Sequence, residues 1–99
     1  MRVVEIRKKE DCSDGGMIYE YHFDDGFPQH VMRRLADGGT LQFFPEFARP
    51  FFKIVTADGV HIKGIIGQFS IEALFPRTGK LERKSQFESF LGEVLAELK

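Results

Sequence analysis

The residues of this chain that could do chemistry at close spacing lie in the stretch "YHFDDGFPQH", which holds His22, Asp24, Asp25 and His30. Imidazole and carboxylate groups are ligands that zinc and non-haem iron accept in proteins. The spacing matches no motif with a mechanism behind it, and His22 is expected on a strand whereas His30 is expected on a helix. The other interpretation is that the aspartates stabilise a helix start and both histidines are surface residues. A metal-dependent enzyme is therefore an alternative hypothesis, not the leading one.

His61 and Cys12 are the remaining candidates for reactive groups. His61 is expected on a strand beside Thr56 and Leu74, with no nucleophile or orienting carboxylate next to it. Cys12 is the single cysteine, so it cannot form an internal disulfide, and the carboxylates of "EDCSDGG" are expected to raise the pKa of its thiol. The sequence contains no phosphate-binding loop, dinucleotide fingerprint or cysteine redox pair. We expect no cofactor and no catalytic machinery.

The composition is that of one folded domain spanning residues 1–99, with 42% hydrophobic and 29% charged residues. Phenylalanine is in excess, at 11 residues against 2 tyrosines and no tryptophan, so most of this aromatic surface is expected to be buried. The net charge of −1 argues against a general binder of polyanions. The chain lacks an apolar run of the ~20 residues that span a bilayer, and its first residues lack a signal-peptide core. We expect no membrane partner and a cytoplasmic location.

The first 40 residues predict a hairpin followed by a short helix. "RVVEIRKK" is a β-rich run, "DCSDGG" supplies turn residues, and "MIYEYHF" alternates in polarity. In "DDGFPQHVMRRLADGG", Pro28 suits the first helical position, and Gly38 is a plausible stop. Phe27, Val31 and Leu35 fall on one stripe of that helix.

A strand is predicted to begin at "TLQFF", and two turn signals then predict the pairing of three more strands. Asp58-Gly59 is typical of a two-residue type I′ turn, and Gly67-Gln68 fits a type II′ turn. If both turns are taken literally, the register is fixed. Val55 then lies opposite Ile62, and Ile62 lies opposite Ala73.

This register gives the sheet one apolar face, which is the predicted core, and a second face of mixed character. The apolar face has a single charged exception, Lys53 beside Gly64. On the second face Lys63 lies directly across from Glu72, which is a favourable cross-strand pair. The residues predicted to lie under the helices are Phe51, Val55, Ile62, Ile66 and Ile71.

The second face also gathers Phe52, Ile54 and Ile65, which need a cover because burying each is worth about 1.5–3 kcal/mol. The cover could be the Phe-rich loop 41–50 acting as an intramolecular lid, a second copy of the chain, or another partner. The predicted interaction surface consists of Phe52, Ile54, Ile65, His61, Lys63, Phe43, Phe44 and Phe47.

The last segment predicts a helix that covers the apolar face. Ser85-Gln86-Phe87-Glu88 has the form of a capping box, with Thr78 as a rival start. Gly92 inside this helix costs about 1 kcal/mol relative to Ala, and close approach to the sheet would explain it. The predicted fold is an α+β two-layer sandwich of order β-β-α-β-β-β-β-α, with an antiparallel sheet and both helices on one face. The apolar stripe of the last helix is Phe87, Leu91, Val94 and Leu98.

The leading functional hypothesis is a small non-catalytic interaction domain that self-associates, or binds another protein, through the second face or a sheet edge. The metal-dependent enzyme is one alternative to this hypothesis. The other is a module that binds single-stranded nucleic acid, since aromatic side chains on a sheet can stack on bases. The acidic net charge and Glu72 in the middle of the face count against nucleic acid. The residues that could serve it are Phe52, Lys63, Arg49, Arg77 and Lys80.

Overall fold

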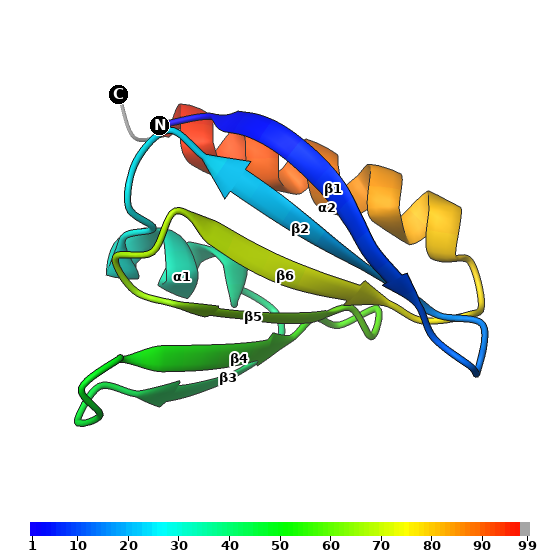
Figure 1. The fold of residues 1–99 in the computed structure, drawn as a ribbon, viewed down its shortest axis with the longest axis horizontal. Helices are drawn as coiled ribbons and strands as arrows, with labels where there is room; N and C mark the ends of the chain where they lie inside the picture. The colour runs from blue at the N-terminus through cyan, green and yellow to red at the C-terminus, as the bar shows by residue number, and fades with distance from the viewer. Residues whose placement is uncertain (98–99) are drawn as a thin grey trace.

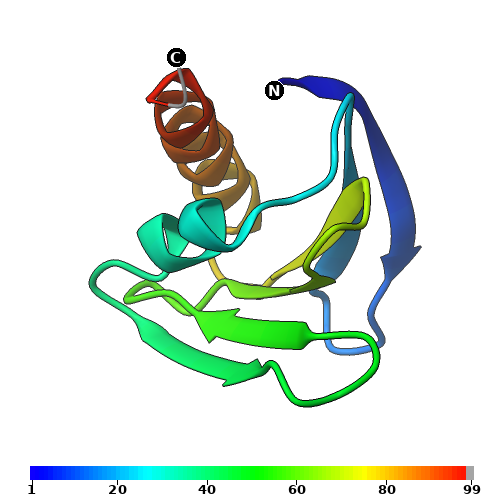
Figure 2. The ribbon, with the colours of Figure 1, turned by 90° about the vertical axis from the view of Figure 1, so that its left-hand side faces the viewer.

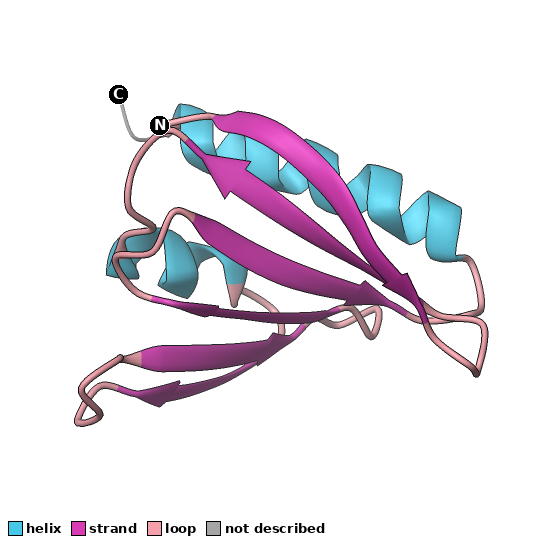
Figure 3. Ribbon diagram, viewed as in Figure 1, coloured by secondary structure: helices cyan, strands magenta, loops and turns pink. Residues whose placement is uncertain are grey.

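The computed structural model describes residues 1–97, which form an antiparallel sheet of six strands and two helices (Figures 1 and 3). The strand order in the sheet is β1-β2-β6-β5-β4-β3. The predicted α+β class, the antiparallel sheet and the order of the elements are confirmed. The elements are β1 (Val3–Asp11), β2 (Met17–Phe23), α1 (Gln29–Leu35), β3 (Thr40–Phe44), β4 (Phe51–Val55), β5 (His61–Ile65), β6 (Ser70–Phe75) and α2 (Lys80–Ala96).

β1 and β2 form the predicted N-terminal hairpin. On β2 the predicted alternation is confirmed, because Met17, Tyr21 and Phe23 are buried while the residues between them are partly exposed. β1 is the outer strand of the sheet, is exposed along nearly its whole length, and is irregular in its pairing at two places. Charged side chains and bulges are the devices that protect a sheet edge from pairing with another chain.

α1 is the predicted short helix, with Val31 and Leu35 buried on its inner stripe. Phe27, which precedes the helix, is fully buried and stacks on Phe52 with ring centroids 5.5 Å apart. Pro28 occupies the N-cap rather than the first helical position. Gly38 follows the helix with φ of 78° and ends it as predicted.

The predicted pairing of β5 with β6 is confirmed from His61 opposite Leu74 to Gly64 opposite Ile71. Ile62 lies opposite Ala73, and Lys63 lies opposite Glu72, whose carboxylate is 3.7 Å from the Lys63 ammonium. The turn itself differs from the predicted one, since the Gln68 N–H donates to the Ile65 carbonyl at 3.1 Å. The register does not depend on that difference.

The predicted pairing of β4 with β5 is wrong by one residue, because Val55 lies opposite His61 and not opposite Ile62. A type I′ turn would require positive φ at Asp58, whereas only glycines have positive φ in residues 1–97, Gly59 with 87° among them. The loop therefore has three residues between Thr56 and Val60, with Gly59 as its left-handed member. The Thr56 hydroxyl accepts a hydrogen bond from the Val60 N–H at 3.0 Å and fixes this longer turn.

A shift of one residue moves every side chain of β4 to the other face of the sheet. Phe52 and Ile54 are fully buried in the core, so their predicted place on the second face is wrong. The predicted core positions of Phe51 and Val55 are also wrong, since both face away from it and Val55 is 38% exposed. The observed register also takes the single charged residue, Lys53, out of the predicted core, because Lys53 is exposed.

α2 begins at Lys80, about one and a half turns before the predicted capping box, with Gly79 as its N-cap. Ser85 therefore lies inside the helix and caps nothing, and the capping-box prediction is wrong. The run "KLERK" before Ser85 consists of good helix formers, so nothing interrupts the helix there. Leu98 of the predicted stripe lies outside the described residues; the buried members of α2 are Phe87, Leu91, Val94 and Leu95.

The buried side chains of the strands and of the two helices form one continuous cluster. The Phe87 ring meets the rings of Tyr21 and Phe75 edge-on, at centroid distances of 5.2 and 5.8 Å. Figure 2 shows the sheet curving from β1 to β3 and the two helices next to each other. No helix within residues 1–97 is long and apolar enough to cross a membrane.

Candidate interaction surface

The face of the sheet opposite the buried cluster is exposed or half-exposed, and we call it the open face. Strand side chains alternate between the two faces, so the pattern on β6, with Ile71, Ala73 and Phe75 buried, assigns the residues between them to the open face. The pairings of the six strands then arrange the open face in three rows across the sheet. Two of these rows are continuous from β4 to β2: Lys53, Lys63, Glu72 and Glu20; and Val55, His61, Leu74 and Ile18. The third consists of two pairs, Phe51 with Ile65 on β4 and β5, and Ser70 with His22 on β6 and β2.

The middle row is charged, and its charges are grouped by sign. Lys53 lies directly opposite Lys63, and Glu72 lies directly opposite Glu20. Like charges in directly opposed positions on neighbouring strands destabilise a sheet. The contact between Lys63 and Glu72 joins the two halves of the row, which otherwise places two positive strands beside two negative ones.

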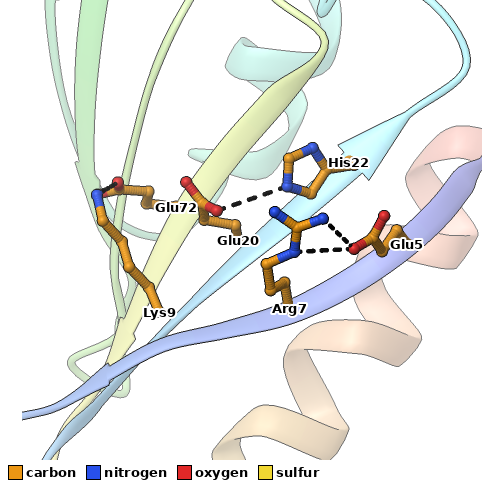
Figure 4. A network of polar contacts seen from close by, with 6 residues as sticks. All are labelled: Glu5, Arg7, Lys9, Glu20, His22 and Glu72. Carbon is orange, nitrogen blue, oxygen red and sulfur yellow. Dashed lines mark hydrogen bonds and ion pairs between the residues drawn. The ribbon is translucent and has the colours of Figure 1, made fainter.

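Figure 4 shows how the acidic half of the row is balanced from β1. The Lys9 ammonium reaches over β2 and donates to the Glu72 carboxylate. Glu20 lies between Glu72 on β6 and Arg7 on β1, and the His22 Nε2 atom is 3.6 Å from its carboxylate, beyond hydrogen-bond distance. That nitrogen is buried and has no hydrogen-bond partner within residues 1–97. Glu72 thus has two lysine partners, Lys9 and Lys63, whereas no lysine or arginine of residues 1–97 forms an ion pair with Glu20.

A hollow of about 400 Å³ lies on the open face over β4, β5 and β6. Its apolar part is supplied by Ile18, Val55 and Leu74, and its polar part by His61 and members of the charged row. Two of these apolar residues, Ile18 and Leu74, are directly opposed on neighbouring strands. The hollow is therefore an apolar depression beside charges.

The other end of the open face is aromatic. The rings of Phe44, Phe47 and Phe51 stack on one another, with centroid distances of 4.6 to 5.9 Å. Phe47 sits in the turn between β3 and β4 and remains 52% exposed. A second hollow of about 430 Å³ begins beside Phe51 and continues to Arg49 and the charged row.

The structure brings together five of the eight predicted interaction residues. His61, Lys63, Ile65 and Phe44 lie on the open face, with Phe47 at its end. The remaining three do not belong to it: Phe52 and Ile54 are in the core, and Phe43 pairs with Phe52 and lies under Arg33.

The predicted metal ligands do not converge. The Asp24 carboxylate accepts a hydrogen bond from the Arg2 N–H at 2.9 Å, which is the main cause that lowers the Asp24 pKa. The Asp25 carboxylate accepts from the Gly26 N–H at 2.8 Å, and His30 is exposed on α1. Within residues 1–97 no three His, Cys, Asp or Glu side chains are placed to hold a metal ion.

The residues considered for nucleic-acid binding are dispersed. Phe52 is fully buried and presents no ring face to a base. Lys80 donates to the Gly15 carbonyl at 3.2 Å, and the Arg77 side chain packs against Gly15, so both lie at the β1–β2 turn. Only Arg49 and Lys63 line the open face, where they are accompanied by Glu20 and Glu72.

Cys12 lies at the same turn and is half-buried. Desolvation, followed by the nearby carboxylates of Asp14, Glu10 and Asp11, raises the pKa of its thiol, as the acidic surroundings predicted. A thiol with a raised pKa stays protonated at neutral pH and is a poor nucleophile.

Sequence reasoning missed Ile18, Glu20, Lys53 and Val55 as members of the open face. The strand register that exposes Lys53 and Val55 depends on a single turn. The sequence did contain a sign of this register. The predicted register placed Lys53 in the middle of an otherwise apolar face, which indicates a shift of one residue. Glu20 and Ile18 could be placed only once the pairing of β2 with β6 was known.

The comparisons with known proteins give no match. No protein-family model, curated protein or solved structure is significantly similar to the chain. The function is therefore argued from the open face alone.

Proposed function

We propose that this protein is a small non-catalytic interaction domain that associates with a second copy of itself through the open face. The observation that carries the proposal is the combination of partly exposed apolar side chains, at both ends of the face, with a charged row between them. Large apolar patches rimmed by polar residues mark surfaces that bind other proteins.

The apolar residues of the open face support association because they gain most from a cover. Val55, Leu74 and Ile18 line one hollow, and Phe51, on which Phe44 and Phe47 stack, lines the other. Removing apolar surface from water contributes about 25 cal/mol per Å². Exposed aromatic rings are also the residue type that dominates protein interfaces.

The edges of the sheet are less suited to association than the open face. β1 carries charged residues along the exposed edge and is bulged. β3 is only five residues long and is followed directly by Pro45. Short, charged or proline-bounded edge strands resist the addition of another strand.

We also propose that the fold is a two-layer sandwich in which both helices pack on the same face of the sheet. It is supported by the contacts of Phe87 in α2 with Tyr21 and Phe75, and by the stacking of Phe27, next to α1, on Phe52. All of these rings belong to the one buried cluster. In such a sandwich the opposite face has no cover from the helices. A lone thiol that stays reduced fits a cytoplasmic location.

The test is to place a charge in the apolar hollow. Val55→Lys should leave the fold intact, because Val55 already reaches water, but should convert the dimer to a monomer. Light scattering coupled to size exclusion measures the mass, and circular dichroism checks the fold. Leu81→Lys is the matched control, since Leu81 is an exposed apolar residue on α2, away from the open face. A wild-type protein that stays monomeric at millimolar concentration would refute self-association.

A further inference from the structure

The charged row of the open face contains a pattern that a single chain does not favour. Lys53 and Lys63 are directly opposed on β4 and β5, and Glu72 and Glu20 are directly opposed on β6 and β2. Each pair repels itself within the sheet. Within residues 1–97, Lys53 makes no ion pair. Glu20 lies across from Arg7 of β1, but the Arg7 guanidinium pairs with Glu5, and the His22 Nε2 atom is 3.6 Å from the Glu20 carboxylate. Read across the four strands, the row carries two positive charges and then two negative ones.

We propose that this row is the recognition element of a symmetric dimer, in which a second copy packs face to face with its two-fold axis parallel to the strands and between β5 and β6. This inference rests on the proposed function and specifies its geometry. Rotation about that axis places Lys53 over the partner's Glu20 and Lys63 over the partner's Glu72. Each contact occurs twice, because the interface of a two-fold dimer is self-complementary.

The same rotation also matches the rows on either side of the charges. Val55 comes to lie over the partner's Ile18, and His61 over the partner's Leu74. At the aromatic end Phe51 comes to lie over the imidazole of the partner's His22. Sheets packed face to face lie about 10 Å apart, and the twist of each sheet turns its outer strands away from the partner, so these residues meet closest near the axis.

The charges oppose a face-to-face arrangement in which the two-fold axis follows the charged row, perpendicular to the strands. If the axis lay in the interface but perpendicular to the strands, each strand would cross its own copy. Lys53 would then face Lys53, and Glu20 would face Glu20. Juxtaposed like charges at an interface suppress that arrangement.

Two single substitutions test the geometry, Lys53→Glu and Glu20→Lys. Within one chain Lys53→Glu replaces the like-charge pair with Lys63 by an opposite-charge pair. Glu20→Lys does the same with Glu72, but it also places the new lysine across from Arg7 of β1. Across the dimer each instead creates two repulsive contacts. Each variant alone should therefore dimerise at least about tenfold more weakly than wild type. The melting temperature of Lys53→Glu under dilute, monomeric conditions should stay equal or rise.

An equimolar mixture of the two variants should recover wild-type affinity. In the mixed dimer the glutamate introduced at position 53 of one chain faces the lysine introduced at position 20 of the other. At the second, symmetry-related contact the unchanged Lys53 of one chain faces the unchanged Glu20 of the other. Both contacts therefore join opposite charges again.

Sedimentation velocity at low salt measures these affinities, and Glu93→Lys, on the exposed side of α2, is the control for a change of net charge alone. Weak variants that recover on mixing support the proposed axis. Wild-type dimers whose affinity is unchanged by both substitutions would overturn the axis and leave self-association standing. Two weak variants that fail to recover on mixing would also overturn it. A monomeric wild type would instead reject the proposed function itself.

Discussion

Gly92 shows how a single residue can differ in role from what its type suggests. A glycine inside a helix is expected where the helix closely approaches a neighbour, but a Cβ added at Gly92 would meet no atom within 4 Å. The predicted close approach to the sheet is therefore wrong. Gly64 on β5 is the opposite case, because a Cβ there would lie 2.9 Å from the Ile71 side chain.

We therefore expect Gly92→Ala to raise the free energy of unfolding by about 1 kcal/mol, which is the difference in helix propensity between the two residues. Gly64→Ala should lower it, because the new methyl group meets Phe52 and Ile71 in the core. Urea denaturation of both variants measures the difference. Destabilisation by Gly92→Ala would mean that the helix packs more closely than the structure shows.

Tyr21 is the buried residue whose polar tip is most specifically satisfied. Its side chain is fully buried, and its hydroxyl donates to the Glu88 carboxylate at 2.8 Å. Glu88 is also paired with the Lys84 ammonium at 2.7 Å. Burial, and then the hydrogen bond to Glu88, raise the pKa of the Tyr21 phenol far above its usual value.

A raised pKa means that the folded protein holds the Tyr21 proton more tightly than the unfolded chain does. This contribution to stability is complete below about pH 10, the pKa of an unfolded tyrosine, and is lost as the pH rises above it. Tyr21→Phe should cost about 1–2 kcal/mol at pH 7 and should flatten the decline of stability above pH 10. Thermal melts of both proteins from pH 8 to 11 compare the slopes, and identical slopes would contradict the assignment.

At the scale of elements, the strands and helices could be predicted because their signals are local. Alternation marked β2, the stripe of Phe27, Val31 and Leu35 marked α1, and turn residues separated the strands. The register of β4 could not be predicted, since Asp58-Gly59 fits both a two-residue turn and a three-residue turn with a left-handed glycine. The choice depends on φ at one residue.

The start of α2 was predicted at Ser85, five residues too late. A capping box marks a helix start only where the residues before it are not helical. Ser85→Ala should leave the free energy of unfolding unchanged or slightly higher, because Ala is the better helix former and no cap is lost. Phe87→Ala should cost about 3–5 kcal/mol as a deleted core aromatic. Chemical denaturation measures both. A loss of about 1 kcal/mol on Ser85→Ala would restore the capping box.

At the scale of the whole molecule, the sequence indicated a second sheet face in need of a partner but assigned it partly wrong residues. His61, Lys63 and Ile65 were placed correctly because the pairing of β5 with β6 was predicted correctly. Lys53 and Val55 were missed through the shift of β4. The grouping of charges depends on pairs between strands distant in the chain, such as Glu20 with Glu72, which no local pattern predicts.

The central claim is that the open face is buried between two copies of the chain. The most direct measurement is a dilution series of amide NMR spectra, because it reports each strand separately. We expect signals of Val55, His61 and Leu74 on the open face, and of Ile18 beside them, to shift with concentration, while those of α2 stay fixed. Spectra that do not change over the whole range, or shifts confined to the edge strands β1 and β3, would contradict the claim.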